Sequence, residues 1–142
     1  MPPPVPPKNR AATTPDYVSP DGAEIHLVLR PEVEGVQFHS VCEAVFRPGQ
    51  VSRAVRHRAV EESWYVLEGE AEVWRLAPGT PLAHAVVQRL GVGEALNIPP
   101  GFSFQVRSAG PGRLRMLCST APPWPGPDEA TPVEGGFGDP SG

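Results

Sequence analysis

Two stretches bounded by glycine constrain the fold of this chain more than any other feature. The first runs from Gly49 to Gly69 (GQVSRAVRHRAVEESWYVLEG) and the second from Gly93 to Ser108 (GEALNIPPGFSFQVRS). Each contains short runs rich in β-branched and aromatic residues, separated by turn signals such as Pro99-Pro100-Gly101. No stretch has a helical apolar period of useful length. The pattern predicts an all-β domain built from short antiparallel strands.

The rest of the chain continues this alternation of β-rich runs and turn signals. Gly69 separates two such runs and is expected to turn a tight hairpin. The loop at 77–84 is expected to be the variable connection between the two stretches. The predicted strands are Glu24–Leu29, Val36–Phe46, Ser52–Arg58, Trp64–Glu68, Ala71–Leu76, Ala85–Leu90, Ala95–Ile98, Phe104–Arg107 and Arg113–Ser119.

The first stretch resembles the first signature motif of the cupin superfamily, whose members are small β-barrels that often hold one metal ion. The family pattern is Gly, five residues, His, one residue, His, three or four residues, Glu, six residues, Gly. Gly49, His57, Glu62 and Gly69 meet this spacing, whereas Val55 stands at the first histidine position. The frame of the motif is therefore kept, but one metal ligand is replaced by an apolar side chain.

The second stretch resembles the second cupin motif. The family pattern is Gly, five residues, Pro, one residue, Gly, two residues, His, three residues, Asn. Gly93, Pro99 and Gly101 fit it, whereas Phe104 and Ser108 stand at the histidine and asparagine positions. The two resemblances imply a cupin jelly-roll barrel, also called a double-stranded β-helix, with a degenerate metal site. They do not imply one function, because this fold carries many unrelated activities.

By this resemblance the chain keeps only two of the residues that hold the metal in the family, His57 and Glu62. In the family, two His and the Glu of the first motif hold the metal together with the His of the second. Two protein ligands rarely hold a divalent ion against water, so we expect no cofactor. The alternative is an iron, zinc, manganese or nickel ion at a rebuilt site, held by His57, Glu62 and His39, with His26 as a further candidate.

Without a metal, the resemblance places His57 and Glu62 as two titratable groups that face one apolar cavity. We hypothesise a metal-independent acid–base pair that acts as an isomerase, cyclase, dehydratase or epimerase on an apolar or planar small metabolite. The other interpretation is that the two residues are relics hydrogen-bonded to each other. Function is thus open between such an enzyme, a non-catalytic small-molecule-binding cupin and a metal-dependent cupin oxygenase.

Five further residues are expected to shape the substrate pocket: Arg53, Val55, Trp64, Phe104 and Met116. Arg53 shares its strand parity with Val55 and His57, which predicts that it reaches the cavity mouth. Gln105 and Arg107 alternate away from Phe104 and are expected to face outward. On the last strand the apolar face, with Met116 and Cys118, is expected to face inward. Cys42 and Cys118 are expected to be buried free thiols, with a disulfide as the alternative.

Length and composition bound the organisation of the chain. Its 142 residues suit one domain, and its 20 prolines collect at the two ends. We therefore expect a largely disordered proline-rich segment over 1–22, the barrel over 23–120 and a proline- and glycine-rich tail over 121–142. Trp124 in that tail is expected to lie back against the barrel, since burying so large a side chain offsets the loss of freedom.

Charge and apolar runs limit the partners. The net charge of −4 argues against a nucleic-acid partner, and no apolar run is long enough to span a membrane. We see no signal peptide, so a cytoplasmic location is expected. The resemblance also implies a homodimer, because barrels of this family commonly pair through their outer sheet edges. A small-molecule ligand or substrate is the remaining expected partner.

Overall fold

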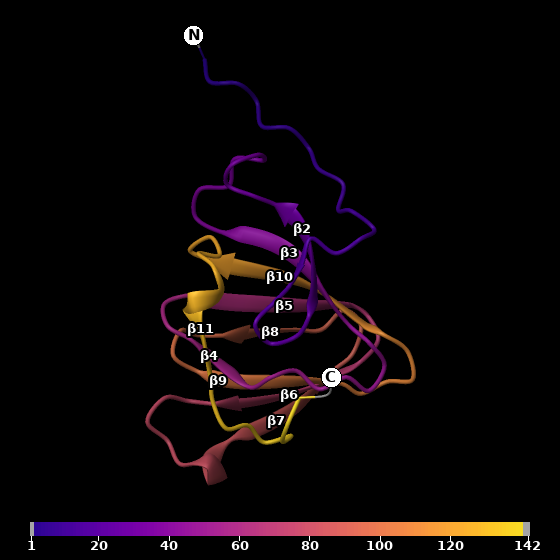
Figure 1. Ribbon diagram of the computed structural model, residues 1–142, viewed down its shortest axis with the longest axis vertical. Helices are drawn as coiled ribbons and strands as arrows, with labels where there is room; N and C mark the ends of the chain where they lie inside the picture. The colour runs from indigo at the N-terminus through magenta and orange to yellow at the C-terminus, as the bar shows by residue number, and fades with distance from the viewer. Residues whose placement is uncertain (1, 141–142) are drawn as a thin grey trace.

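The computed structural model describes residues 2–140 and folds them into two antiparallel sheets that face each other (Figure 1). The first sheet has six strands, in the spatial order β1 (Tyr17–Val18), β2 (Glu24–Leu29), β3 (Ser40–Phe46), β10 (Leu114–Ala121), β5 (Glu61–Glu68) and β8 (Ala95–Ile98). The second has five, in the order β11 (Ala130–Pro132), β4 (Val55–His57), β9 (Ser103–Ser108), β6 (Ala71–Leu76) and β7 (Val86–Leu90).

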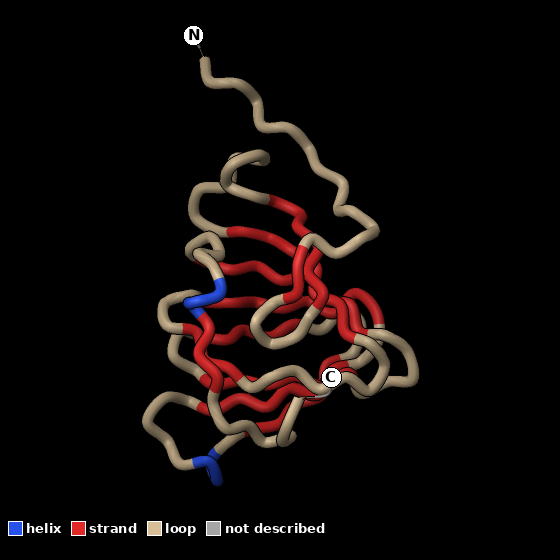
Figure 2. The backbone as a smooth tube through the Cα atoms, in the orientation of Figure 1, coloured by secondary structure: helices blue, strands red, loops and turns tan. Residues whose placement is uncertain are grey.

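This arrangement confirms the predicted all-β jelly-roll barrel. Two short 3-10 helices, η1 (Leu82–His84) and η2 (Pro127–Glu129), are the helical segments of the described chain (Figure 2). Consecutive strands often lie in different sheets: β4 belongs to the second sheet and β5 to the first. The short β4–β5 connection therefore carries the chain from one sheet to the other, as a jelly roll requires.

The core fills the space between the sheets with apolar side chains that alternate along the strands. Phe46, Val66, Val73 and Leu114 are all at most 1% exposed. At Gly69, between β5 and β6, the backbone has a φ of +85°, and a Cβ atom would collide with the carbonyl of Arg113. The tight hairpin predicted at this glycine is thus confirmed, and no other residue type fits there without strain.

Several strand ends differ from the predicted ones. β3 begins at Ser40 rather than at residue 36, because β2 ends at Leu29, which pairs with Val41. Residues before Ser40 thus have no partner strand. β5 begins at Glu61 rather than Trp64, because β10 continues to Ala121 and offers partners to the additional residues. The bounds of β2, β6 and β8 agree with the prediction.

Both terminal segments contribute strands beyond the predicted barrel range of 23–120. β1 pairs with β2, and β11 pairs with β4, where Ala130 is the partner of His57. The first residues of the chain extend away from the barrel, whereas the C-terminal segment runs back across the second sheet (Figure 1). Within residues 2–140, none of the helices has the length and apolarity needed to cross a lipid bilayer.

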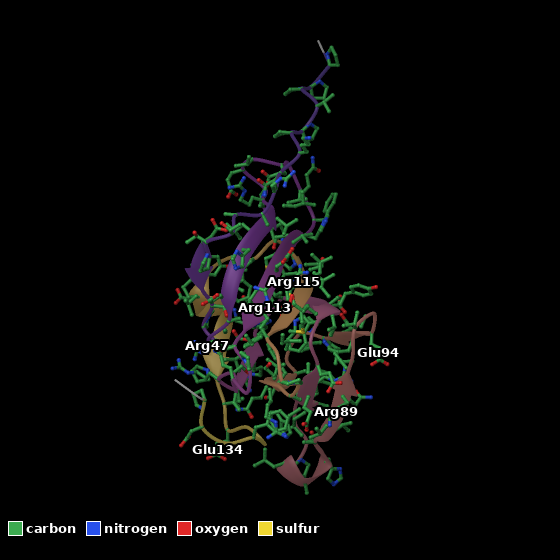
Figure 3. The ribbon with its side chains drawn as sticks, turned by 90° about the vertical axis from the view of Figure 1, so that its right-hand side faces the viewer. Arg47, Arg89, Glu94, Arg113, Arg115 and Glu134 are labelled. Carbon is green, nitrogen blue, oxygen red and sulfur yellow. The ribbon has the colours of Figure 1, made fainter. Side chains whose placement is uncertain are left out.

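The outer face of the first sheet carries a cluster of ion pairs. Arg115 Nη1 lies 3.0 Å from Glu43 Oε1, and both Arg113 and Arg115 contact Glu68. Figure 3 shows the two arginines together on the outside of the barrel. Their neighbours Leu114 and Met116 are buried. The predicted phase of this last strand, with the apolar face inward, is therefore confirmed.

Candidate functional site

A cavity of about 670 Å³ lies between the sheets. Its volume is in the range of known small-molecule sites. Most of its wall is apolar and comes from β2, β3, β4, β5 and β10. The titratable side chains of the wall are those of Tyr17, Asp21, Arg30, Glu32, Cys42, His57, Glu62 and Cys118. The site is thus an apolar barrel interior with a limited set of polar groups.

Glu62 is the second residue of β5, and it faces the cavity together with Trp64, two residues further along the strand. Its side chain keeps some accessible surface, because the cavity wall is open to water, but its carboxyl group is crowded by protein. This burial raises the pKa of Glu62 to about 8; the like charge of Asp21 adds to the shift, and a hydrogen bond with Trp64 opposes it. Glu62 is therefore mostly a neutral acid at pH 7.

No nearby cation offsets this effect in the described part of the cavity wall. Burial also raises the pKa of Asp21, against hydrogen bonds from Ser19 and from the Ala23 amide. Arg30 lies along the same wall, but its guanidinium is engaged by Glu34, with Nη2 2.7 Å from Oε2 and Nε 3.0 Å from Oε1. The two acids thus share an environment that disfavours negative charge.

His57 ends β4 and approaches the cavity from the opposite sheet. It is 5% exposed, and its Nδ1 is buried without a hydrogen-bond partner among the described residues. Burial lowers the pKa of His57 to about 4, although the charge of Glu129 acts in the other direction. The imidazole is therefore neutral at pH 7. A relic pair in which Nδ1 is bonded to Glu62 is not what the structure contains.

Aromatic rings hold the imidazole in place. The ring of Phe104 lies edge-on to that of His57, with centroids 5.0 Å apart, and also meets Trp64 at 5.5 Å. On another side the ring of Trp124 lies 5.1 Å from His57. Phe104 is thus a buried support behind His57 rather than part of the cavity lining, which corrects the sequence-based expectation.

Of the other predicted pocket residues, some line the cavity and one does not. Val55, Trp64 and Met116 line the cavity, as expected. Arg53 does not: its side chain is exposed and borders a separate depression next to Leu82 and Glu134. Its position outside β4, which begins at Val55, explains the difference, because strand alternation does not extend to it.

The residues present do not fit a cupin metal centre. Val55 and Phe104, at two ligand positions, are 1% exposed and offer no donor atom. His26 points away from the cavity, since its neighbours Ile25 and Leu27 line it, and its Nδ1 bonds the carbonyl of Ala12 at 2.7 Å. His39 precedes β3 and is not among the lining residues, so neither histidine rebuilds the site. Within residues 2–140, no three His, Cys, Asp or Glu side chains gather as metal ligands.

The C-terminal segment closes one end of the cavity. The Trp124 amide donates to Ser40 Oγ at 3.0 Å, and Gly126, Pro127 and Ala130 complete the wall. Glu129, which is 4% exposed, accepts hydrogen bonds from the amides of Ala59 and Val60. The prediction that Trp124 lies back against the barrel is confirmed. Neither Asp21 in the cavity wall nor Glu129 near His57 was predicted, because an acidic residue in a proline-rich segment gives no sign of being buried.

The same segment explains an unexpected burial. Gln105 faces out of the barrel, as its strand position predicts, yet it is 0% exposed. Its Nε2 donates to the carbonyls of Ser52 and Gly138, and its Oε1 accepts from the Phe137 amide. Phe137 in turn lies 4.4 Å below the guanidinium of Arg107. The tail therefore covers this outward face.

Comparison with known proteins agrees with this architecture. The family model described as the cupin domain matches residues 42–120. An uncharacterised protein of Methanocaldococcus jannaschii is 27% identical over 108 residues, which cover 76% of this chain and 80% of the relative.

Solved structures share the fold at lower identity. The cupin domain of Drosophila melanogaster CENP-C bound to CAL1 superimposes with a TM-score of 0.59 at 21% identity, over 69% of this chain and 70% of that one. Peruvianin-I, a cysteine peptidase from Thevetia peruviana latex, has a TM-score of 0.68 at 20% identity, over 85% and 72%. Bacillus subtilis oxalate decarboxylase has a TM-score of 0.74 at 14% identity, over 92% of this chain and 33% of the enzyme. These likenesses show the fold alone.

Proposed function

The chain belongs to the cupin domain family, and from that premise we propose that its barrel binds an uncharged, largely apolar small molecule. The observation that carries the proposal is the cavity of about 670 Å³ between the sheets. Its apolar wall supplies the driving force for binding, and its few polar groups orient the ligand. A charged ligand is disfavoured, because the environment that keeps Glu62 and His57 neutral also opposes other buried charges.

We propose proton transfer as the chemistry of this site, without a metal. Glu62 in its protonated form can donate to a carbonyl oxygen, and the unpartnered Nδ1 of neutral His57 can accept a proton from a neighbouring carbon. The two side chains come from opposite sheets, so a planar ligand between them would meet an acid on one side and a base on the other. Acid–base pairs whose environments drive their pKa values apart are common in enzymes that move protons at neutral pH. Isomerisation, cyclisation, dehydration and epimerisation are reactions of this class.

A non-catalytic binding cupin is the second candidate. A pKa of about 4 makes His57 a weak base at neutral pH, which favours this alternative. The cupin domain of CENP-C was crystallised bound to CAL1. A protein of the same fold thus forms a complex with another protein.

Binding can be tested with phenylnaphthylamine, an uncharged planar fluorophore. Titration should raise its emission and quench Trp64 and Trp124, both of which line the cavity. Ala44→Phe should weaken binding at least about tenfold by filling the cavity, whereas Ala95→Phe on the exposed surface of β8 should not. Equal affinity in both variants would place the dye elsewhere and overturn the proposal.

Catalysis is tested separately by proton exchange at a ketone. The protein should accelerate deuterium uptake from heavy water at the α-carbon of β-tetralone. The double variant His57→Gln, Glu62→Gln should lose that rate while it keeps dye affinity within about twofold. A native protein that binds the dye but does not accelerate exchange would leave the binding module as the function.

A further inference from the structure

The two cysteines of this chain meet inside the barrel wall. Cys42 on β3 and Cys118 on β10 are direct partners in the antiparallel register of these neighbouring strands. Both are free thiols and both line the cavity. They lie 76 positions apart in the sequence, between residues 42 and 118, and only the pairing of β3 with β10 brings them together.

Sheet geometry makes this pair competent to form a disulfide. Directly opposed residues in an antiparallel ladder point to the same face, and their Cα atoms are about 4.5 or 5.5 Å apart, depending on the type of pair. A disulfide requires Cα atoms about 4.4–6.8 Å apart, so either type satisfies it. The Cys42 side chain lies close enough to Cys118 to raise the pKa of its thiol. A bond between them therefore needs no change of strand register, only a small local approach of the two side chains.

The surroundings favour a disulfide over a metal as the partner of these thiols. Within the described chain no third His, Cys, Asp or Glu completes a metal-ligand group with them. Cys42 is half-buried and Cys118 is 3% exposed, so a reagent that enters the cavity meets Cys42 first. The neighbouring Cys42 and burial raise the pKa of the Cys118 thiol well above its usual value, which leaves Cys118 unsuited to the first attack.

We propose that Cys42 and Cys118 form a reversible dithiol–disulfide pair in the cavity wall, which a low-molecular-weight disulfide oxidises in place. Cys42 loses its proton and attacks the reagent, a mixed disulfide forms, and the departing reagent thiolate takes up that proton to leave as a thiol. Cys118 then attacks the Cys42 sulfur, its proton passes to the second departing thiolate, and the strands become cross-linked. The protein loses two hydrogens, and the reagent gains them as two thiols. This proposal does not depend on the proposed ligand or reaction.

The experiment uses bis(hydroxyethyl) disulfide, which is neutral and small, with acid quenching and mass spectrometry. The native protein should lose the mass of two hydrogens, yield one peptide pair linked through Cys42 and Cys118, and recover both thiols with a reductant. Cys118→Ser should stop at a stable adduct on Cys42. Cys42→Ser should react at least about tenfold more slowly than Cys118→Ser, because only the buried thiol remains.

Oxidation of the unfolded chain in urea serves as the reference, because it shows how readily the two cysteines link when the fold does not hold them together. The intramolecular disulfide should form in native protein at least about tenfold more favourably than in urea, where a long loop must close by chance. Three results would each overturn the proposal. They are adducts on both cysteines without a link, dimers joined by disulfides, and a native protein that resists oxidation while the unfolded chain reacts. This comparison needs no variant, so it stands even if a serine variant fails to fold.

Discussion

At the scale of single residues, the features that matter most are two neutral titratable groups within one apolar cavity. Burial acts on Glu62 and His57 in the same sense, since it disfavours the charged form of each. The consequence for the pKa is opposite: it rises for the acid and falls for the base. The spacing of the first cupin motif placed both residues at the site. Their protonation follows from neighbours that the motif does not contain, among them Asp21 and Trp124.

The first prediction concerns Glu62 and the upper pH range. Its folded pKa of about 8 exceeds the ordinary value of 4.5, so the folded state keeps a proton that the unfolded chain releases, and stability falls as pH rises between these values. Between about pH 4 and 6.5 the unfolded chain binds a proton at His57 that the folded state does not, so His57 opposes this trend there. From about pH 6.5 to 8, Glu62→Gln should therefore remove a decline of up to about 1.4 kcal/mol per pH unit in the free energy of unfolding. Urea unfolding at pH 6.5 and 8 measures it, and an equal decline in both proteins would contradict it.

The second prediction concerns His57 and the lower pH range. Its folded pKa of about 4 lies below the ordinary 6.5, so the unfolded chain takes up the proton first and stability falls as pH drops from 6.5 to 4. His57→Leu should remove this contribution and, by deleting an unpartnered buried Nδ1, leave stability at pH 7 unchanged or raised by about 1–3 kcal/mol. Urea unfolding at pH 5 and 7 tests it. A loss above about 2 kcal/mol at pH 7 would show that the imidazole is satisfied.

At the scale of elements, the C-terminal segment is the part whose structure departs most from expectation. Proline and glycine over 121–142 predict an extended tail. Part of it instead forms η2 and β11 and closes the cavity, and a later part covers the second sheet. Proline is compatible with the short edge strand β11, which pairs on one side only. Glycine permits the close approach that follows: a Cβ at Gly136 would collide with the indole of Trp74.

The third prediction tests this docking. Gly136→Ala should displace the tail from Trp74 and Gln105, lower the free energy of unfolding by about 1–3 kcal/mol and expose Phe137 to chymotrypsin. The matched control is Gly112→Ala, because a Cβ at Gly112 meets no atom within 4 Å. Urea unfolding and limited proteolysis report the two effects. Identical behaviour of the two variants would show that the tail is not held at Trp74.

At the scale of the whole molecule, the edge strand β7 presents apolar side chains to solvent. β7 is the last strand of the second sheet, and its residues Val86 and Val87 are 53% and 51% exposed. Leu82 in the adjacent η1 is 54% exposed. An open edge with apolar side chains is a site at which another sheet can pair. The expected homodimer stays a prediction, and we place its contact at this edge.

The fourth prediction concerns that contact. The native protein should be a dimer by light scattering, and Val87→Lys should shift it to the monomer by placing a charge in the contact. Val5→Lys is the control, since Val5 is exposed on the N-terminal segment, away from β7. A monomeric native protein would refute the dimer. A dimeric Val87→Lys protein would move the interface to another surface.

The sequence by itself determined most of the strands and turns, because these depend on local turn chemistry. The barrel and the positions of His57 and Glu62 followed from the resemblance of its residue spacing to the two cupin motifs. Gly69 and Pro99-Pro100-Gly101 mark turns whatever lies around them. The tertiary structure alone decided which side chains share the cavity: it excluded Arg53 and His39, brought in Asp21 and Trp124, and paired Cys42 with Cys118. Such contacts join residues far apart in the chain, and burial, which sets their charge, is a property of the packed barrel rather than of any segment.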